Sequence, residues 1–477
     1  MARTHEAGSM HSPGAGVTAI VPSWLQAPAD VNELLPALWS KTVHRNGDGV
    51  LTVGGLDAAE LAATHGTPLF VLDEEDFRAR AVAFRDAFAD AFAELCGGAD
   101  VYYAGKSFLA TGVARWLAED GLHLDTCSGG ELALGLRGGV RPDWIALHGN
   151  NKSRGEIRGA LQAGVGRLVV DSLEEIDVVA QIARELGVVA PVMLRVTVGV
   201  EAHTHSYIAT AHEDQKFGLS LAGGAAELAV ARVVARPELA LRGLHSHIGS
   251  QIFDMGAFEV SARRLLGLHH AVQREHGVEL PEIDLGGGFG MAYTSEHQPL
   301  APAEIAGRLA EIVARECLSQ GIAVPKVSVE PGRSISGPST FTLYEVGTTK
   351  DVALDAGAHR RYVSVDGGMS DNIRTALYDA DYSATLASRA STAPGVLSRV
   401  VGKHCESGDV VVKDEFLPAD ATAGDLLAVP GTGAYCRSMA SNYNQLPRPA
   451  VVAVRDGASR VLVRRETPED LLALDAG

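Results

Sequence analysis

The sequence predicts an α/β fold in which a closed parallel (β/α)8 TIM barrel is followed by a β-rich domain. Short continuous apolar runs alternate with amphipathic helical patterns from about Leu69 to Glu330, and eight such runs fit the strands of a barrel. After Pro331 the pattern changes to strand-like runs separated by turns such as Asp456-Gly457. An open doubly wound sheet is the alternative for the first part, because it shows the same alternation of strands and helices.

The barrel elements can be read in order along the chain. A first helix is expected at Glu74–Leu95. Eight strands are predicted after it, at Val101–Ala104, Leu122–Asp125, Trp144–His148, Arg167–Asp171, Val192–Val198, Leu241–His247, Glu282–Leu285 and Lys326–Glu330. Amphipathic helices are expected between strands at Ser128–Arg137, Ser153–Ala163, Leu173–Leu186, Phe258–His276 and Pro302–Ser319. Several of these helices begin with a residue that caps helix N-termini.

The C-terminal domain is predicted to be a β-sandwich or barrel-like fold that also takes in the N-terminal segment. Its strands are expected at Phe341–Val346, Tyr362–Val365, Val410–Val412, Leu426–Pro430, Pro449–Val454 and Arg460–Arg464. An early strand at Val50–Val53 is expected to pack with this domain, because chain ends often lie close together. The predicted division is a disordered tail over 1–29, an N-terminal segment over 30–72, the barrel over 73–344 and the β-domain over 345–477.

Composition narrows the class of protein. The chain of 477 residues has a net charge of −18, which argues against non-specific binding to nucleic acid. Its five cysteines form no Cys-x-x-Cys pair, which indicates free thiols in a reducing compartment. No apolar run is long enough to span a bilayer, and no signal-peptide pattern opens the chain. We therefore expect a cytoplasmic protein with no membrane or nucleic-acid partner.

Unusual residues stand where the predicted strands end. The strand ends carry Lys106, Asp125 to Ser128, His148 to Lys152, His245 to Ser250, Gly286 to Gly290 and Glu330 to Arg333. In an eight-fold barrel all of these meet at the face that holds active sites. The sequence therefore predicts one site built from several loops.

Lys106 is the most informative of these residues. A lysine at the mouth of a buried strand loses its proton more easily, and a neutral amine can form a Schiff base with an aldehyde cofactor such as pyridoxal phosphate. Alone, a lysine beside a strand is usually a solvated surface residue. The glycine run Gly286–Gly290 is either a plain turn or a loop whose amides approach a phosphate. Glu330 is either a surface carboxylate or the partner of a pyridine nitrogen.

Histidines raise the question of a metal. His245 and His247 form one pair, and His203, His205 and His212 form a second group within a polar stretch, Glu201–Gln215, long enough to be a lid. No third ligand is spaced as in a zinc signature, and there is no four-cysteine set. We therefore expect no metal.

Seven motifs occur in order along nearly all of the chain after Asn46. They are Tyr103-Ala104-Gly105-Lys106, His245–Gln251 (HSHIGSQ), Gly286–Gly290 (GGGFG), Glu330–Arg333 (EPGR), Ser370–Tyr378 (SDNIRTALY), Cys405–Asp409 (CESGD) and Gly433-Ala434-Tyr435. With these motifs the chain resembles the fold-type III pyridoxal-phosphate-dependent decarboxylases, which have an alanine-racemase-like barrel. The resemblance is closest to the diaminopimelate decarboxylases.

The resemblance implies a role for each matching residue. Lys106 would hold the cofactor covalently, His247 would stack on its ring, and Glu330 would pair with its pyridine nitrogen. The phosphate would be surrounded by Ser250, Gly287, Gly288 and Gly332, and Arg333 would be a further cofactor-binding residue. Tyr435 would touch both cofactor and substrate. Cys405 would donate a proton and would come, together with Glu406, from the second subunit of a homodimer with shared active sites.

The substrate implied by the resemblance is meso-2,6-diaminopimelate, which carries an amino acid group at each end. Arg333 and Arg374 suit the carboxylate of the unreactive end, because a guanidinium forms a matching fork. Glu406 suits its ammonium group, and Tyr378 can add a hydrogen bond. The expected reaction is decarboxylation at the D-centre to L-lysine and CO2. A decarboxylase of ornithine, arginine or carboxynorspermidine, an amino-acid racemase and a non-enzymatic binding protein are the alternatives.

Overall fold

The computed structural model describes residues 21–199, 216–354 and 359–477. The chain divides into two compact units. We call the first the β unit (Met1–Phe77, Met291–Gln298 and Ser336–Gly477) and the second the barrel unit (Arg78–Gly290 and Pro299–Ile335). Most of the predicted tail, the histidines His203, His205 and His212, and the proposed lid lie outside the described residues.

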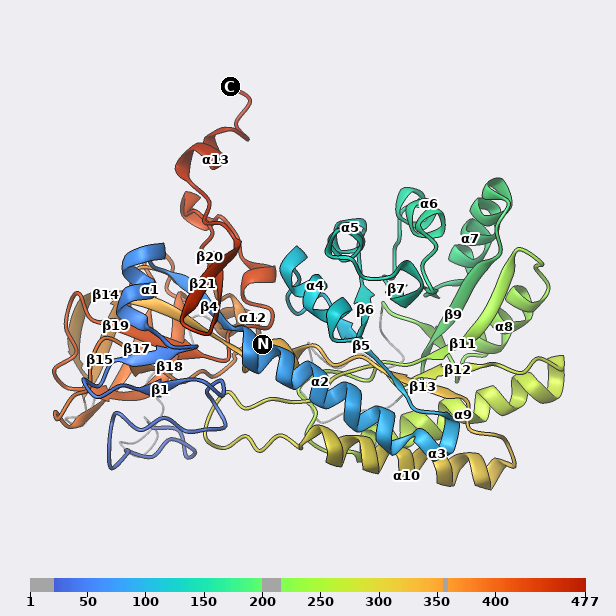
Figure 1. The fold of residues 1–477 in the computed structure, drawn as a ribbon, viewed down its shortest axis with the longest axis horizontal. Helices are drawn as coiled ribbons and strands as arrows, with labels where there is room; N and C mark the ends of the chain where they lie inside the picture. Colours follow the sequence, from blue (N-terminus) through green and yellow to red (C-terminus); the bar gives the residue numbers. More distant parts are fainter. Residues whose placement is uncertain (1–20, 200–215, 355–358) are drawn as a thin grey trace, which may run out of the picture. The chain divides into compact units, whose positions relative to one another are not determined.

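Eight parallel strands of the described chain close the barrel unit into a ring (Figure 1). They are β5 (Asp100–Ala104), β6 (His123–Thr126), β7 (Ile145–Leu147), β8 (Arg167–Val170), β9 (Ala190–Thr197), β11 (Leu239–His245), β12 (Glu282–Asp284) and β13 (Lys326–Val329). Ring closure is seen where β8 pairs with β9 through Leu168 and Val192, and where β13 pairs with β5 through Ser328 and Asp100. The closed barrel is confirmed, and the open doubly wound sheet is wrong. A short additional strand, β10 (Leu219–Ser220), pairs with β9.

Helices follow the barrel strands and pack outside the ring (Figure 1). They are α2 (Glu74–Ala91), α3 (Ala93–Cys96), α4 (Thr111–Glu119), α5 (Gly129–Gly138), α6 (Arg154–Ala163), α7 (Leu173–Leu186), α8 (Ala225–Val234), α9 (Gly256–His276), α10 (Pro302–Gln320) and α11 (Arg333–Ser336), with a 3-10 turn at Pro142–Trp144. The side chains of Ser128, Ser153 and Ser172 cap α5, α6 and α7, as the sequence predicts. The single helix predicted at Glu74–Leu95 is two helices, because the backbone leaves helical geometry at Phe92.

The β unit is built on a second, mostly antiparallel sheet with the strand order β18-β17-β15-β14-β4-β20-β21. These strands are β4 (Leu69–Asp73), β14 (Thr340–Ala353), β15 (His359–Val365), β17 (Gly395–Val401), β18 (Val410–Pro418), β20 (Ala450–Arg455) and β21 (Ala458–Val463); β16 (Thr385–Leu386) and β19 (Leu426–Pro430) branch from it. The sequence reading missed β17 and β4, and β4 lies inside this sheet between β14 and β20. Helices α12 (Arg374–Tyr378) and α13 (Pro468–Leu472) and 3-10 turns at Arg437–Met439 and Tyr443–Gln445 complete the unit.

The N-terminal segment lies in the β unit, as predicted. The early strand is β2 (Leu51–Val53), which pairs with β1 (His44–Arg45) and β3 (Leu56–Asp57) ahead of α1 (Ala58–His65). It therefore does not join the large sheet as a strand, but the Leu51 amide donates to the Ala387 carbonyl at 2.9 Å. Leu51 and Val53 are buried in one core with Phe341 and Val452. Among the described helices, none is long and apolar enough to cross a membrane.

Candidate active site

The loops after β5, β12 and β13 pack tightly against one another at the carboxyl ends of the strands. Lys106 stands two residues beyond β5, and Glu330 follows β13 directly. The Glu330 amide donates to the Gly286 carbonyl at 2.9 Å, and the Ala104 amide donates to the Pro331 carbonyl at 3.1 Å. The predicted convergence of strand ends is therefore present for these three loops.

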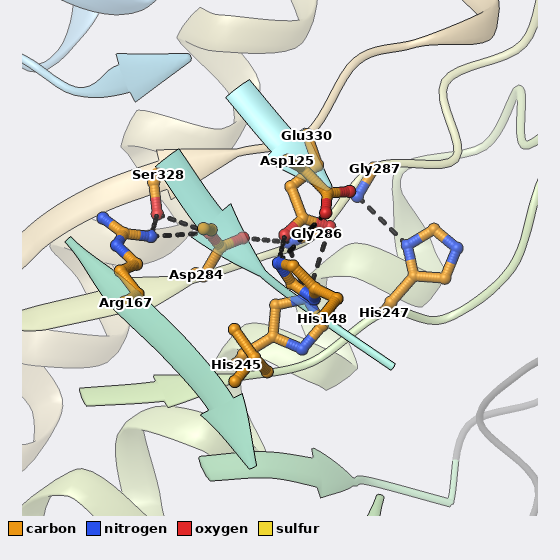
Figure 2. Close-up of polar contacts among 12 residues, drawn as sticks. Asp125, His148, Arg167, His245, His247, Asp284, Gly286, Gly287, Ser328 and Glu330 are labelled. Carbon is orange, nitrogen blue, oxygen red and sulfur yellow. Dashed lines mark hydrogen bonds and ion pairs between the residues drawn. The ribbon is translucent and has the colours of Figure 1, made fainter. Parts of the chain in front are cut away.

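A buried cluster of carboxylates and imidazoles lies where the strands end (Figure 2). Oε1 of Glu330 lies 3.1 Å from Nε2 of His148, and Oε2 of Glu330 lies 3.3 Å from Nε2 of His245. The two rings meet edge to face, with centroids 4.9 Å apart. Glu330 therefore sits between two imidazoles that come from two different strand ends.

Two more carboxylates border this cluster. Oδ1 of Asp125 lies 3.4 Å from Nε2 of His148. Asp284, at the end of β12, is paired with the Arg167 guanidinium at 3.0 Å and accepts a hydrogen bond from the Ser328 hydroxyl at 2.7 Å. Figure 2 shows Asp284 and Arg167 on one side of Glu330 and Asp125 beside it. The charge of Asp284 is thus compensated by Arg167, whereas the ion-pair partner of Asp125 among the described residues is His148.

The charges in the cluster oppose the effect of burial on Glu330. Burial favours the neutral carboxyl, but the charges and hydrogen bonds of His245 and His148 outweigh it and hold the pKa of Glu330 well below its ordinary value. Burial likewise opposes a charged His148, but the carboxylates of Asp125 and Glu330 raise its pKa. Burial raises the pKa of Asp125, with the charge of Glu330 adding to the effect. Glu330 is therefore the carboxylate of the pair that stays ionised.

His247 and Lys106 are less deeply buried than the residues of the cluster. The Gly287 amide donates to Nδ1 of His247 at 3.2 Å, so this nitrogen carries no proton. Burial and the charge of Lys106 hold the pKa of His247 well below its ordinary value. His247 therefore presents a neutral ring, which suits stacking on an aromatic cofactor.

The remaining cofactor candidates lie in the loops that follow β11, β12 and β13. Nη2 of Arg333 donates to the Ser250 hydroxyl at 2.8 Å. A side chain at Gly287 would bring its Cβ to 2.0 Å from the Glu330 carbonyl, and one at Gly332 would meet Ala104 at 2.9 Å. Only glycine allows these loops to approach each other so closely. Gly288 lies in the same loop as Gly287 and is half-buried.

These residues fit pyridoxal phosphate. Glu330 is buried at the strand ends, and its pKa is held well below its ordinary value. An ionised carboxylate is the group that keeps a pyridine nitrogen protonated. A neutral His247, the Lys106 amine and the Ser250–Arg333 pair supply a stacking surface, an attachment point and an anion site.

The predicted substrate residues belong to the β unit, apart from Arg333. Arg374 is buried, with 6% of its surface exposed. Its Nη1 donates to the Tyr382 hydroxyl at 2.8 Å, and its guanidinium lies 4.7 Å from the centre of the Tyr293 ring. The Tyr382 hydroxyl also lies 3.5 Å from the Cys436 sulfur, beside Tyr435. Arg374 is thus held in a fixed aromatic cage, and Tyr293, Tyr382 and Cys436 were not singled out from the sequence.

Cys405 and Glu406 are exposed in the β unit, and Tyr378 and Tyr435 are partly exposed. Their loop is anchored by the next residues along the chain. Oδ2 of Asp409 accepts a hydrogen bond from the His404 amide at 2.7 Å, and Nε2 of His404 lies 2.8 Å from the Ser370 hydroxyl. Cys405 is therefore exposed on a loop that is fixed by the hydrogen bonds of His404.

The structure also shows what sequence reasoning missed in the barrel unit. Asp125 and His148 were noted as strand-end residues, but nothing in the sequence linked them to Glu330. The ligand atoms of His148, His245 and Glu330 all lie within 4.8 Å of one another, a grouping that could hold a metal ion. The expectation of no metal therefore stays a prediction. Only the closure of the barrel brings these side chains together.

Comparison with known proteins identifies the family of the chain. Residues 76–337 match the family described as pyridoxal-dependent decarboxylase, pyridoxal binding domain. The chain is 52% identical to the diaminopimelate decarboxylase of Mycobacterium leprae over 99% of both chains. It is 54% identical to that of Mycobacterium tuberculosis over 93% of this chain and 100% of the other.

Solved structures give the same result. The diaminopimelate decarboxylase of M. jannaschii in complex with L-lysine superposes with a TM-score of 0.85 at 31% identity, over 92% of this chain and 99% of the other. A lysine/ornithine decarboxylase from Vibrio vulnificus, at 23% identity and a TM-score of 0.68, shares the fold. Identity of this extent shows that the chain belongs to the diaminopimelate decarboxylase family, whose members are enzymes that use pyridoxal phosphate as cofactor.

Proposed function

We propose that this enzyme removes the carboxyl group at the D-centre of meso-2,6-diaminopimelate and releases L-lysine and CO2, the last step of lysine biosynthesis. The observation that carries the proposal is the ionised, buried Glu330 at the same strand ends as Lys106 and the Ser250–Arg333 pair. The relatives with 52% and 54% identity are diaminopimelate decarboxylases, which supports the substrate. The solved relative with bound L-lysine supports the product.

The barrel unit supplies the cofactor site in this proposal. Bound pyridoxal phosphate supplies a sink for the electron pair that remains when CO2 departs. The Lys106 amine would hold the cofactor aldehyde, and Glu330 would keep the ring nitrogen protonated. His247 would stack on the ring. The phosphate is bound by a set of hydroxyl, guanidinium and amide donors: Ser250, Arg333, Gly287, Gly288 and Gly332.

The β unit supplies selectivity and a proton. Arg374, already fixed by Tyr382, binds the carboxylate of the unreactive end of the substrate together with Arg333. Tyr378 and Tyr435 add hydrogen bonds, and Glu406 binds the distal ammonium. The Cys405 thiol protonates the carbon from which CO2 has left.

Cys405 and Glu406 act, in this proposal, in the active site of a second subunit. Both side chains are exposed, as residues offered to another chain would be. The enzyme is therefore proposed to be a homodimer with shared sites, working in the cytoplasm. The acidic net charge of −18 agrees with a small-molecule substrate and with no nucleic-acid partner.

A substrate panel tests the proposal. Purified enzyme with added pyridoxal phosphate is incubated with meso-diaminopimelate, L-ornithine, L-arginine or D-lysine, and both CO2 and the amine or amino acid product are measured. Lysine and CO2 in equal amounts from meso-diaminopimelate alone are expected. CO2 from another substrate instead would overturn the assignment of Arg374 and Glu406. Inversion of an amino acid without CO2 would show a racemase.

A further inference from the structure

Two buried residues of the barrel unit have no part in the proposed chemistry, although both lie in the cluster around Glu330 (Figure 2). His148 stands between two carboxylates, with Nε2 at 3.1 Å from Oε1 of Glu330 and 3.4 Å from Oδ1 of Asp125. Asp125 is 1% exposed, and neither of its oxygens accepts a hydrogen bond within the described part of the chain. A buried carboxylate that accepts no hydrogen bond from the described residues requires a reason for its presence.

Two carboxylates so close together in a buried site cannot both stay ionised without a positive charge between them. If the proton went to Glu330, this residue could no longer keep a pyridine nitrogen protonated. The position of His148 decides the outcome, because its ring contacts both carboxylates and a charged ring lets Glu330 remain anionic beside Asp125. His245 contacts Glu330 as well.

We propose that His148 is a positioning residue that holds Glu330 as an oriented, ionised carboxylate, and that Asp125 is a second carboxylate that competes with Glu330 for the charge of His148. The inference rests on the proposed role of Glu330 and deepens it. Neither Asp125 nor His148 touches the substrate in this arrangement. They act on the reaction only through Glu330.

The surrounding charges agree with this division of roles. The Asp125 and Glu330 carboxylates raise the pKa of His148 against the effect of burial. Of the two carboxylates, burial raises the pKa of Asp125, whereas the imidazoles lower that of Glu330. Other titratable or charged groups also act on these three residues, namely Lys106, Cys127, Glu131, His245, His247 and Asp284. Asp284 is paired with Arg167 but still helps to raise the pKa of His148.

Substitutions of His148 and Asp125 are therefore expected to have different effects on the pH profile of kcat. In His148→Gln the neutral amide no longer balances Asp125, so Glu330 takes up a proton at higher pH than before. The acid limb of the pH profile of kcat should move up by about one pH unit. In Asp125→Asn the competing carboxylate is gone, so the acid limb should stay in place or move down. The double variant should regain at least half of the shift, because the repulsion that harms His148→Gln has been removed.

The experiment uses the purified holoenzyme and the four proteins of this cycle, with His276→Gln as a matched control. His276 is an exposed histidine at the end of α9. Two quantities are measured from pH 5.5 to 9: kcat, and the Kd of the apoprotein for pyridoxal phosphate. At pH 6.5, His148→Gln should bind the cofactor about tenfold more weakly than wild type. Asp125→Asn should be within about twofold of wild type in that Kd.

Several results would overturn the proposal. One is an acid limb in His148→Gln that stays at the wild-type pH, and another is a double variant with a larger shift than His148→Gln. A loss equal at every pH would show a structural role only. If His148→Gln does not fold, the test rests on Asp125→Asn. An upward shift of the acid limb in the pH profile of kcat of this variant would contradict the proposal. Should the wild type not decarboxylate meso-diaminopimelate, the cofactor Kd still tests the cluster, so the two failures are distinguishable.

Discussion

Glu330 in the barrel unit and Asp371 in the β unit are both buried carboxylates. The pKa of Glu330 is lowered, whereas the pKa of Asp371 is raised. Glu330 is 4% exposed and Asp371 is 1% exposed. Two imidazoles hold the pKa of Glu330 well below its ordinary value. Burial raises the pKa of Asp371 to about 7, although the Tyr344 hydroxyl and the Gly368 amide donate hydrogen bonds to it.

The difference shows what a buried carboxylate needs in order to stay charged. Neutral donors reduce the cost of burying Asp371 but leave its carboxyl able to take up a proton near neutral pH, and the charges of Asp366 and Asp409 add to this effect. Only the cationic neighbours of Glu330 reverse the effect of burial. The ionised carboxylate of Glu330 therefore suits a role in the reaction. The carboxyl of Asp371 instead accepts hydrogen bonds from the Tyr344 hydroxyl and the Gly368 amide within the β unit.

The largest effect is expected when the charge of Glu330 is removed. Glu330→Gln keeps the shape but cannot keep a pyridine nitrogen protonated, so kcat should fall by about 10³-fold, or about 4 kcal/mol of activation free energy. Asp371→Asn, the matched change in the β unit, should alter kcat by less than about threefold, because Asp371 makes only structural contacts. Steady-state CO2 release measures both. Equal losses in the two variants would contradict the comparison.

A smaller loss is expected for the proton donor of the β unit. Cys405→Ala should lower kcat by about 10²-fold, the usual contribution of a positioned general acid. Binding of pyridoxal phosphate, followed by its absorbance, should not change, since the cofactor site lies in the barrel unit. Cys96→Ala is the control, because Cys96 is a partly buried thiol outside the proposed site. Unchanged turnover in Cys405→Ala would remove this thiol from the reaction.

The aromatic cage of Arg374 predicts a binding effect. Arg374→Lys keeps the charge but loses the fork, so KM for meso-diaminopimelate should rise by about 10- to 30-fold with a smaller change in kcat. Tyr382→Phe removes the hydroxyl that accepts from Nη1 and should raise KM by about threefold. Arg464→Lys, at an exposed ion pair with Asp470, is the control. A fall in kcat with KM unchanged would argue against a substrate role.

The smallest effect concerns stability. Because the pKa of Asp371 rises from 3.8 in the unfolded chain to about 7 in the folded protein, the native state holds an extra proton between these values. Stability should therefore fall as pH rises from about 4 to about 7, by on the order of 1–3 kcal/mol. Asp371→Asn cannot ionise and should gain stability relative to wild type between pH 5 and pH 8.

Thermal unfolding at pH 5, 6.5 and 8 measures that gain. Asp456→Asn is the control, because Asp456 is a highly exposed carboxylate. A difference in Tm between Asp371→Asn and wild type that does not grow with pH would show that Asp371 is already ionised in the folded protein.

The sequence predicted those helices and strands that can be recognised from a short stretch of residues. The barrel strands were recognisable as short continuous apolar runs, and serine caps marked three helices. The place of β4 could not be predicted, because Leu69–Asp73 precedes a helix and resembles the first strand of an α/β alternation. Strand β17 was missed because Ser398 and Arg399 interrupt its apolar run.

Contacts between distant residues escaped the sequence for a different reason. The contacts of His148 with Asp125 and Glu330 follow from barrel closure, and the spacing of these residues along the chain does not predict them. The cage of Tyr293 and Tyr382 around Arg374 likewise joins segments that are far apart in sequence. The family resemblance implied a role for each single residue. The structure was needed to show which side chains contact those residues.

The most direct test of the account is complementation between two inactive variants. Lys106→Ala should abolish turnover, and Cys405→Ala should lower it strongly. If each active site takes its lysine from one subunit and its cysteine from the other, coexpression of the two variants should restore about a quarter of wild-type decarboxylation of meso-diaminopimelate, because half of the dimers are mixed and each has one intact site. Activity no higher than the average of the two separate variants would contradict the division of one site between two chains.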